Sequence, residues 1–327
     1  MKIKIEELKE KVTQILEPKF GKEGADAILD CFLWADMSGI STQGVIKLTG
    51  SEPVQDVVPT GQIEVERETK LSKNLNANNN PAPFAATVAM REAITMAKEH
   101  GVAVVGVRNT RSSNGVQAYY VEQMAKNDLI GIMCSRSPAA SAGFGSIDPL
   151  FGTNPVGFGF PTDGAPLVFD MATSAMTFYG LVLAKAQGIE IPKDMAIDKE
   201  GNPTTDPEAA MSGALLSFDR GYKGAGLAMM VEMLAGPLVG SAYIDNKTFE
   251  EEWGTFMIAI DPHILIDRDV FKKNASDLIS KVKESRHIDE IASIRLPGER
   301  AQQNYKKTLE SGEVDVDENI LKEIGLI

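Results

Sequence analysis

Strand-like and helical segments mingle along this chain without a strict alternation. Apolar runs that indicate strands occur at 102–107, 129–135, 156–161, 166–170, 255–260 and 292–297. No GxGxxG sequence follows any of them, because the glycine groups GFGSID and GAGLAM lack the third glycine in the required place. The chain therefore lacks the fingerprint of a doubly wound dinucleotide fold, and we expect an α+β architecture.

Helical periodicity is clearest near the two ends. The first forty residues predict two helices. The tail from Gly298 is charged and helical and ends in a short helix near Ile320. Further helices are predicted at 84–99, 116–126, 174–188 and about 270–285. The polar passage from Ser51 to Pro83, with KNLNANNNPAP in it, predicts a loop.

Composition excludes several classes of protein. A length of 327 residues suggests about two domains, and the net charge of −13 argues against a nucleic-acid surface. The N-terminal MKIKIEELKEKV lacks the apolar core of a signal peptide. The apolar run after Lys223 contains Glu232 and reads as a buried helix broken at Gly236–Pro237, so no membrane span is expected. We expect a cytoplasmic protein with Cys31 and Cys134 as buried thiols and no metal site.

Three motifs between Val168 and Gly236 are too particular for generic core. DMATS (170–174) ends an apolar run with an acid and is predicted to open a helix. In NPTTDPEAA, Asp206 is placed to cap a helix that begins with Pro207. GYKGAG sets Lys223 among three glycines, where the backbone can approach a ligand closely.

In this order and spacing, the motifs resemble the malate/L-lactate dehydrogenase family of the non-Rossmann type. That family includes 2,3-diketo-gulonate reductases, ureidoglycolate dehydrogenases and sulfolactate dehydrogenases. The resemblance implies a mixed-sheet NAD(P)-binding domain, here 76–244, beside a helical domain built from 1–75 and 245–327. It also implies a homodimer, NAD or NADP as cofactor and a small acid as substrate.

Two signatures of the family place its active-site residues. ADMSGISTQGVIKL resembles ADxRGxxSHGVxRL, so that Gln43 stands for the histidine that exchanges the proton. Thr42 stands for the serine and Lys47 for the arginine that helps to hold the acid. RNTRSSNGVQAYY resembles RNxxHFGxxxYY with one extra residue upstream, so that Ser113 stands at its histidine when Gly115 is matched to the glycine. Both histidines implied by the resemblance are therefore replaced.

Removing hydride from an alcohol needs a base for the hydroxyl proton, and glutamine cannot titrate. His100, His263 and His287 read as surface or helix-end residues. Lys47 is the first choice for a replacement, since a desolvated lysine can have its pKa lowered. The other routes left open are Lys223, Tyr119, Tyr120 and a chain of water molecules.

The resemblance also implies the binding residues. Cofactor contacts fall on Asp170, Met171, Ala172, Thr173, Ser174, Tyr222, Lys223, Gly298 and Glu299. Asn154, in GTNP, is expected at the substrate, although that tetrapeptide alone would indicate only a turn. Likewise, DMATS alone would indicate only a helix cap.

Two charged residues leave alternatives open. Arg136 would hold an anionic substrate group, or else form a surface salt bridge. Glu232 reads as a structural acid rather than a catalytic one.

The sequence supports three functions. The first is NAD(P)-dependent hydride transfer on a 2-keto or 2-hydroxy acid by an altered mechanism. The alternatives are a catalytically silent homologue that retains the cofactor in a binding or regulatory role, and a reductase of a different substrate such as a cyclic imine.

Overall fold

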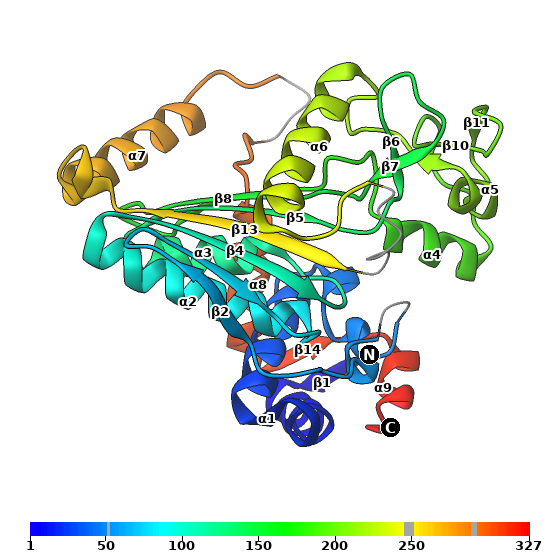
Figure 1. The fold of residues 1–327 in the computed structure, drawn as a ribbon, viewed down its shortest axis with the longest axis horizontal. Helices are drawn as coiled ribbons and strands as arrows, with labels where there is room; N and C mark the ends of the chain where they lie inside the picture. Colours follow the sequence, from blue (N-terminus) through cyan, green and yellow to red (C-terminus); the bar gives the residue numbers. More distant parts are fainter. Residues whose placement is uncertain (51–52, 245–251, 289–292) are drawn as a thin grey trace.

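A computed structural model of the chain describes residues 1–50, 53–244, 252–288 and 293–327. Its centre is a seven-stranded mixed sheet in the order β2-β3-β4-β13-β5-β8-β9 (Figure 1). The strands are β2 (Glu64–Glu68), β3 (Ser72–Asn76), β4 (Val102–Thr110), β13 (Trp253–Ile260), β5 (Ile130–Arg136), β8 (Val156–Phe160) and β9 (Leu167–Met171). Only β3 and β4 pair in parallel, and the other neighbours are antiparallel.

Helices cover both faces of this sheet. On one face lie α2 (Ala82–His100) and α3 (Gln117–Lys126), and on the other lies α6 (Tyr222–Ala235) (Figure 1). Small residues allow close packing, as at Gly159, where a Cβ atom would lie 2.1 Å from the carbonyl oxygen of Val121 on α3. The sheet and its helices place the ends of β4, β5, β8 and β9 around the pocket described below.

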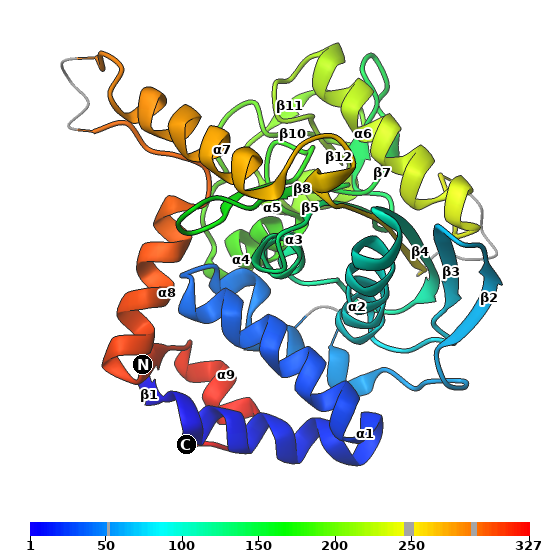
Figure 2. The ribbon, with the colours of Figure 1, turned by 90° about the vertical axis from the view of Figure 1, so that its left-hand side faces the viewer.

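The two ends of the chain pack together. Helix α1 (Ile5–Met37) is kinked at Gly21, which has a positive φ of 67°, so the prediction of two helices is confirmed in substance. Strand β1 (Lys2–Lys4) pairs with β14 (Glu313–Asp315), and α1 contacts α8 (Glu299–Ser311). Figure 2 shows the two termini close together, near α9 (Glu318–Glu323).

Smaller elements complete the fold. A second sheet, in the order β11-β10-β12-β6-β7, carries α4 (Phe178–Gln187) and α5 (Pro207–Ser212) beside it. Its strands are β6 (Ser141–Ala142), β7 (Pro149–Phe151), β10 (Ala196–Ile197), β11 (Pro203–Thr204) and β12 (Ala214–Leu215). Helix α7 (Arg268–Lys283) projects from the edge of the molecule and has no buried residue (Figure 1).

Several local predictions are confirmed. Asp206 caps α5 by accepting a hydrogen bond from the amide of Glu208 at 3.0 Å. Both cysteines are buried and free. Helix α6 ends at Ala235, just before Gly236–Pro237. None of the described helices is long and apolar enough to cross a membrane.

Other local predictions are wrong. The predicted loop contains β2 and β3, whose backbones pair although only Leu75 among their residues is buried. Residues 293–297 form no strand, and residue 292 lies outside the described residues. Helix α6 is only half-buried, because its methionines at 229, 230 and 233 are exposed.

The predicted domain division does not coincide with the sheet. Strands β2 and β3 come almost wholly from the range 1–75, and β13 comes from 245–327. Strand β13 nevertheless lies between β4 and β5, in the middle of the sheet. Both ranges predicted to form a helical domain, 1–75 and 245–327, therefore contribute strands to the sheet.

Candidate active site

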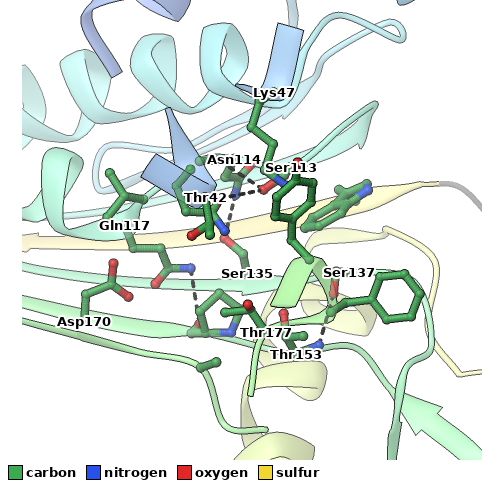
Figure 3. Close-up of a pocket in the computed structure, with 18 of the residues that line it drawn as sticks. Thr42, Lys47, Ser113, Asn114, Gln117, Ser135, Ser137, Thr153, Asp170 and Thr177 are labelled. Atoms are coloured by element: carbon green, nitrogen blue, oxygen red, sulfur yellow. Dashed lines mark hydrogen bonds between the residues drawn. The ribbon is translucent and has the colours of Figure 1, made fainter. Parts of the chain in front are cut away.

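A cavity of about 330 Å³ lies beside the ends of β4, β5, β8 and β9 (Figure 3). The turns after α1 and the beginning of α4 close it from the other side. Its polar lining residues are Thr42, Gln43, Lys47, Ser113, Asn114, Gln117, Ser135, Ser137, Thr153, Asp170, Thr177 and Tyr179. Three of the residues predicted to act in catalysis, Gln43, Lys47 and Ser113, thus meet in one pocket from two distant parts of the chain.

Asp36 fixes the turns that carry Gln43 and Lys47. It is buried at the end of α1, and its Oδ2 accepts a hydrogen bond from the amide of Val45 at 2.8 Å. A Cβ atom on Gly44 would lie 1.9 Å from Asp36 Oδ1, so only glycine fits between the two turns. Burial raises the pKa of the Asp36 carboxyl to about 8, against the opposing effect of the Val45 hydrogen bond.

Gln43 and Ser113 contact each other. Ser113 Oγ lies 3.4 Å from Gln43 Oε1, to which it donates a long hydrogen bond, and it accepts one from the amide of Gly115 at 3.2 Å. Neither side chain can act as a base near neutral pH. The pair can orient a substrate hydroxyl or carbonyl.

Lys47 supplies positive charge to the pocket. It is 7% exposed, and its Nζ lies 4.9 Å from the centre of the Tyr179 ring, which packs it by a cation–π contact. In Figure 3 Lys47 extends into the site toward Ser113. A carboxylate in this cavity would find its cationic partner here.

Two buried amides leave acceptor atoms without a protein partner among the described residues. Asn114 Nδ2 lies 2.6 Å from Ser135 Oγ and 2.7 Å from Thr255 Oγ1, while its Oδ1 is unpaired. Gln117 Nε2 donates to the carbonyl of Pro155 at 3.2 Å, while its Oε1 is unpaired. Buried polar atoms are nearly always hydrogen-bonded, so both acceptors fit a ligand that carries N–H or O–H donors. The sequence did not point to either residue.

Asp170 is the penultimate residue of β9, and its side chain lies at the beginning of α3. Its Oδ2 accepts a hydrogen bond from the amide of Ala118 at 3.0 Å, which caps that helix from outside its own sequence. Burial raises the pKa of Asp170 to about 6, while hydrogen bonds from the amides of Ala118 and Gln117 act in the opposite direction. An acid that titrates near neutrality in a pocket is a candidate for proton exchange.

The remainder of DMATS lies partly in the pocket wall and partly behind it. Met171 and Ala172 line the pocket, but Thr173 and Ser174 do not. Thr173 and Ser174 donate hydrogen bonds to the carbonyls of Thr153 and Met176. They also do not open the helix, because α4 begins at Phe178 and its cap is Thr177.

Arg136 and Asn154 lie outside the pocket lining, in a buried cluster around Glu232. Arg136 Nε lies 3.4 Å from Glu232 Oε1, and Asn154 Nδ2 donates to Glu232 Oε2 at 2.7 Å. Burial lowers the pKa of Arg136, and the two nearby acids, Glu232 and Glu252, oppose that effect. Glu232 has the contacts of a structural acid. The ion pair between Arg136 and Glu232 is buried, whereas the salt bridge considered from the sequence was one at the surface.

The remaining predicted cofactor residues lie apart from this pocket. Tyr222 is 66% exposed at the start of α6, and Lys223 follows it. Gly298 caps α8 and lines a second, adjacent cavity. Glu299 pairs with Lys283 at 2.6 Å.

Several of the side chains considered for proton exchange lie outside the cavity wall. None of His100, His263 and His287 lines the cavity. Neither Tyr119 nor Tyr120 lines it, and Tyr120 donates a hydrogen bond to the carbonyl of Asn114 at 2.7 Å. Within the described residues, the titratable side chains at the cavity wall are Lys47, Asp170 and Tyr179.

Comparison with known proteins identifies this architecture. The family model for malate/L-lactate dehydrogenase matches residues 3–325. The chain belongs to the malate/L-lactate dehydrogenase family. The predicted α+β fold without a Rossmann fingerprint is thereby confirmed, and the protein is an oxidoreductase of the 2-hydroxy-acid dehydrogenase type.

Individual relatives cover most of the chain or nearly all of it. It is 35% identical to an L-sulfolactate dehydrogenase of Methanothermobacter thermautotrophicus, over 97% of this chain and 92% of that protein. It is 30% identical to a Delta(1)-pyrroline-2-carboxylate/Delta(1)-piperideine-2-carboxylate reductase of Pseudomonas aeruginosa, over 81% of this chain and 83% of that protein. The crystal structure of a malate dehydrogenase from Entamoeba histolytica superimposes with a TM-score of 0.91 at 26% identity, covering 99% and 96% of the two chains.

Proposed function

We propose that this protein transfers a hydride between NAD or NADP and a small 2-keto or 2-hydroxy acid. The observation that carries the proposal is the meeting of Gln43, Lys47 and Ser113 with Asp170–Ala172 in one cavity. The unpaired acceptors Gln117 Oε1 and Asn114 Oδ1 fit the two N–H donors of a nicotinamide carboxamide. When bound, the nicotinamide supplies or accepts the hydride.

The side chains divide the remaining tasks. Lys47 attracts the substrate carboxylate. Gln43 and Ser113, already in contact, orient the oxygen of the reacting carbon. We propose that Asp170 and Lys47, at the cavity wall, exchange the proton, because the Gln43 amide does not titrate.

A cyclic imine is a second candidate substrate, and the missing imidazole favours it. A ketone needs both a hydride and a proton, so a positioned acid speeds its reduction. A protonated imine already carries its proton on nitrogen, and addition of hydride to carbon leaves a neutral amine. Such a substrate needs no acid or base at the position of Gln43. Its N–H group can instead donate a hydrogen bond to an acceptor such as Gln43 Oε1.

A reductase screen distinguishes these possibilities. The purified chain is assayed by loss of NADH or NADPH absorbance against a panel of 2-keto acids and cyclic 2-imino acids. Turnover of keto acids supports the first proposal, and turnover confined to imines supports the second. Nucleotide binding with no turnover of either class would instead favour the silent homologue with a binding or regulatory role.

A further inference from the structure

Another cavity, of about 400 Å³, lies between the two arms of α1, helix α3 and helix α8. The kink at Gly21 divides α1 into these arms, and Figure 2 shows them diverging toward α8. None of the residues that line this cavity lines the candidate active site. The cavity is therefore a separate space in which a second ligand can bind.

Three aromatic side chains from three helices meet at this cavity. Trp34 on α1 packs against Tyr119 on α3 and Tyr305 on α8, with 6.5 Å and 6.4 Å between the ring centres. Trp34 Nε1 donates a hydrogen bond to Glu122 Oε2 at 2.9 Å, which fixes the orientation of the indole. Aromatic rings attract organic cations and also provide an apolar surface for their alkyl groups.

The charged side chains of the cavity leave one carboxylate over. Lys9 pairs with Glu6 at 2.9 Å. Lys126 pairs with Glu122 at 2.7 Å, so both lysines at the cavity are already neutralised. Asp30 also lines the cavity and makes no hydrogen bond or ion pair with any residue that the structure describes. A cationic ligand would find its counter-ion in Asp30.

The surroundings of Asp30 support this role. Although Asp30 is exposed, desolvation raises the pKa of its carboxyl, and the nearby Asp26 adds to that effect. Lys9, Arg91 and Lys22 oppose it. Each of these three cations is ion-paired to another acid. A bound cation would therefore stabilise a carboxylate that its protein neighbours leave only partly compensated.

The C-terminal end of α8 adds negative potential. Gly312 caps α8 and lines the cavity, and the last turn of this helix contains no basic residue. The carbonyl groups at a helix C-terminus carry partial negative charge, which favours a cation nearby. The amide of Ile5 donates to the Gly312 carbonyl at 3.0 Å, which joins this end of α8 to the first arm of α1.

We propose that this cavity binds a small alkylated ammonium ion. Asp30 is the counter-ion, and the rings of Trp34, Tyr119 and Tyr305 contact the alkyl groups. A metal ion fits less well, because no group of three or more His, Cys, Asp or Glu among the described residues could hold one. The proposal does not depend on the dinucleotide or on the acid substrate, so it and the proposed function stand or fall separately.

Calorimetric titration with choline tests the proposal, with the uncharged analogue in which carbon replaces the choline nitrogen as the matched ligand. Choline should bind saturably, and the analogue roughly 10-fold more weakly, because it lacks the charge that Asp30 and the rings attract. A wild-type chain that binds neither, or binds both equally, would overturn the proposal. NADH titration of the same sample reports on the proposed function independently.

Asp30→Asn should weaken choline binding roughly 2- to 5-fold, since one partly solvated charge is lost, and leave the analogue unaffected. Asp277→Asn is the matched control, because it makes the same change on exposed helix α7 and does not line the cavity. It should leave the affinity for choline unchanged. Equal losses in the two variants would show an effect of net charge alone and overturn the proposal.

Tyr305→Leu and Tyr305→Phe test the aromatic wall. The leucine variant removes a ring and should weaken choline binding roughly 3-fold, whereas the phenylalanine variant keeps the ring and should bind as wild type does. Circular dichroism of each variant checks that the fold is intact. Choline binding that is unchanged in both Asp30→Asn and Tyr305→Leu would place the cation elsewhere and overturn the proposal.

Discussion

We expect Gln43 and Ser113 to limit the chemistry that this pocket performs. On malate, lactate and their keto acids, turnover should be very low, because a positioned acid or base contributes about 10²- to 10⁴-fold. Gln43→His, alone or with Ser113→His, should raise that turnover if the glutamine occupies a vacated base position. Steady-state kinetics provide the measurement. Rapid wild-type turnover that Gln43→His slows would show instead that the glutamine belongs to a different, working mechanism.

Asp36 predicts a pH dependence of stability. Its pKa is about 8 in the folded chain and about 3.9 in an unfolded one. The folded state therefore binds its proton more tightly, and the stability that this gives is full below about pH 4 and lost as the pH rises through about 8. Asp36→Asn keeps an acceptor for the Val45 amide and removes the titration.

Urea unfolding between pH 4 and pH 9 checks this prediction. The free energy of unfolding of Asp36→Asn should rise relative to wild type between about pH 4 and about pH 8 and level off above about pH 8. The exposed residue Asp277 gives the control variant Asp277→Asn. Parallel profiles for wild type and Asp36→Asn would contradict a buried, protonated Asp36.

Residues from the two local signatures lie together in the structure. Thr42, Gln43, Lys47 and Ser113 all line the pocket, although they come from two segments. It could not predict that Arg136 and Asn154 would meet Glu232, because these partners lie 96 and 78 residues away and no local pattern links them. Asn114 was missed for the same reason, since its partners include Thr255, 141 residues along the chain.

Helix α5 provides a test at the scale of one element. Asp206→Ala removes the oxygen that accepts from the amide of Glu208 and should lower the free energy of unfolding by about 1 kcal/mol. Asp206→Asn keeps a capping oxygen and should stay close to wild type. Denaturant unfolding of the three proteins side by side measures both. An Asn variant as unstable as the Ala variant would show that the cap is not the cause.

Elements with strong periodicity were predicted, and elements held by backbone pairing were not. Strands β4, β5 and β13 are apolar and buried, and their sequence shows it. Strands β2 and β3 are polar and form the edge of the sheet, so their hydrogen bonds to neighbours leave no apolar pattern. Pro297 and Gly298 lie just before α8, and nothing in the sequence of 293–297 reveals that these residues pair with none of the described strands.

At the scale of the whole molecule, α6 exposes an apolar surface that could contact another chain. Met229, Met230 and Met233 are each about half exposed there, and Leu238 follows them at 61%. Large apolar patches on a soluble protein commonly mark interfaces. We expect a symmetric homodimer.

Light scattering at micromolar concentration should give the mass of two chains. Met230→Lys and Met233→Lys together should shift the protein toward the monomer if this face is the interface. A monomeric mass for the wild type would contradict the expectation. A dimer untouched by the two lysines would place the interface on another face.

We propose that the pocket beside the ends of β4, β5, β8 and β9 binds a nicotinamide dinucleotide. Calorimetric titration of the wild-type chain with NADH and NADPH tests it most directly, supported by melting curves at the same concentrations. We predict saturable binding of at least one nucleotide and a melting temperature that rises with the nucleotide concentration, because a ligand that binds only the folded chain stabilises it. No heat and no shift at millimolar concentrations of either nucleotide would contradict it.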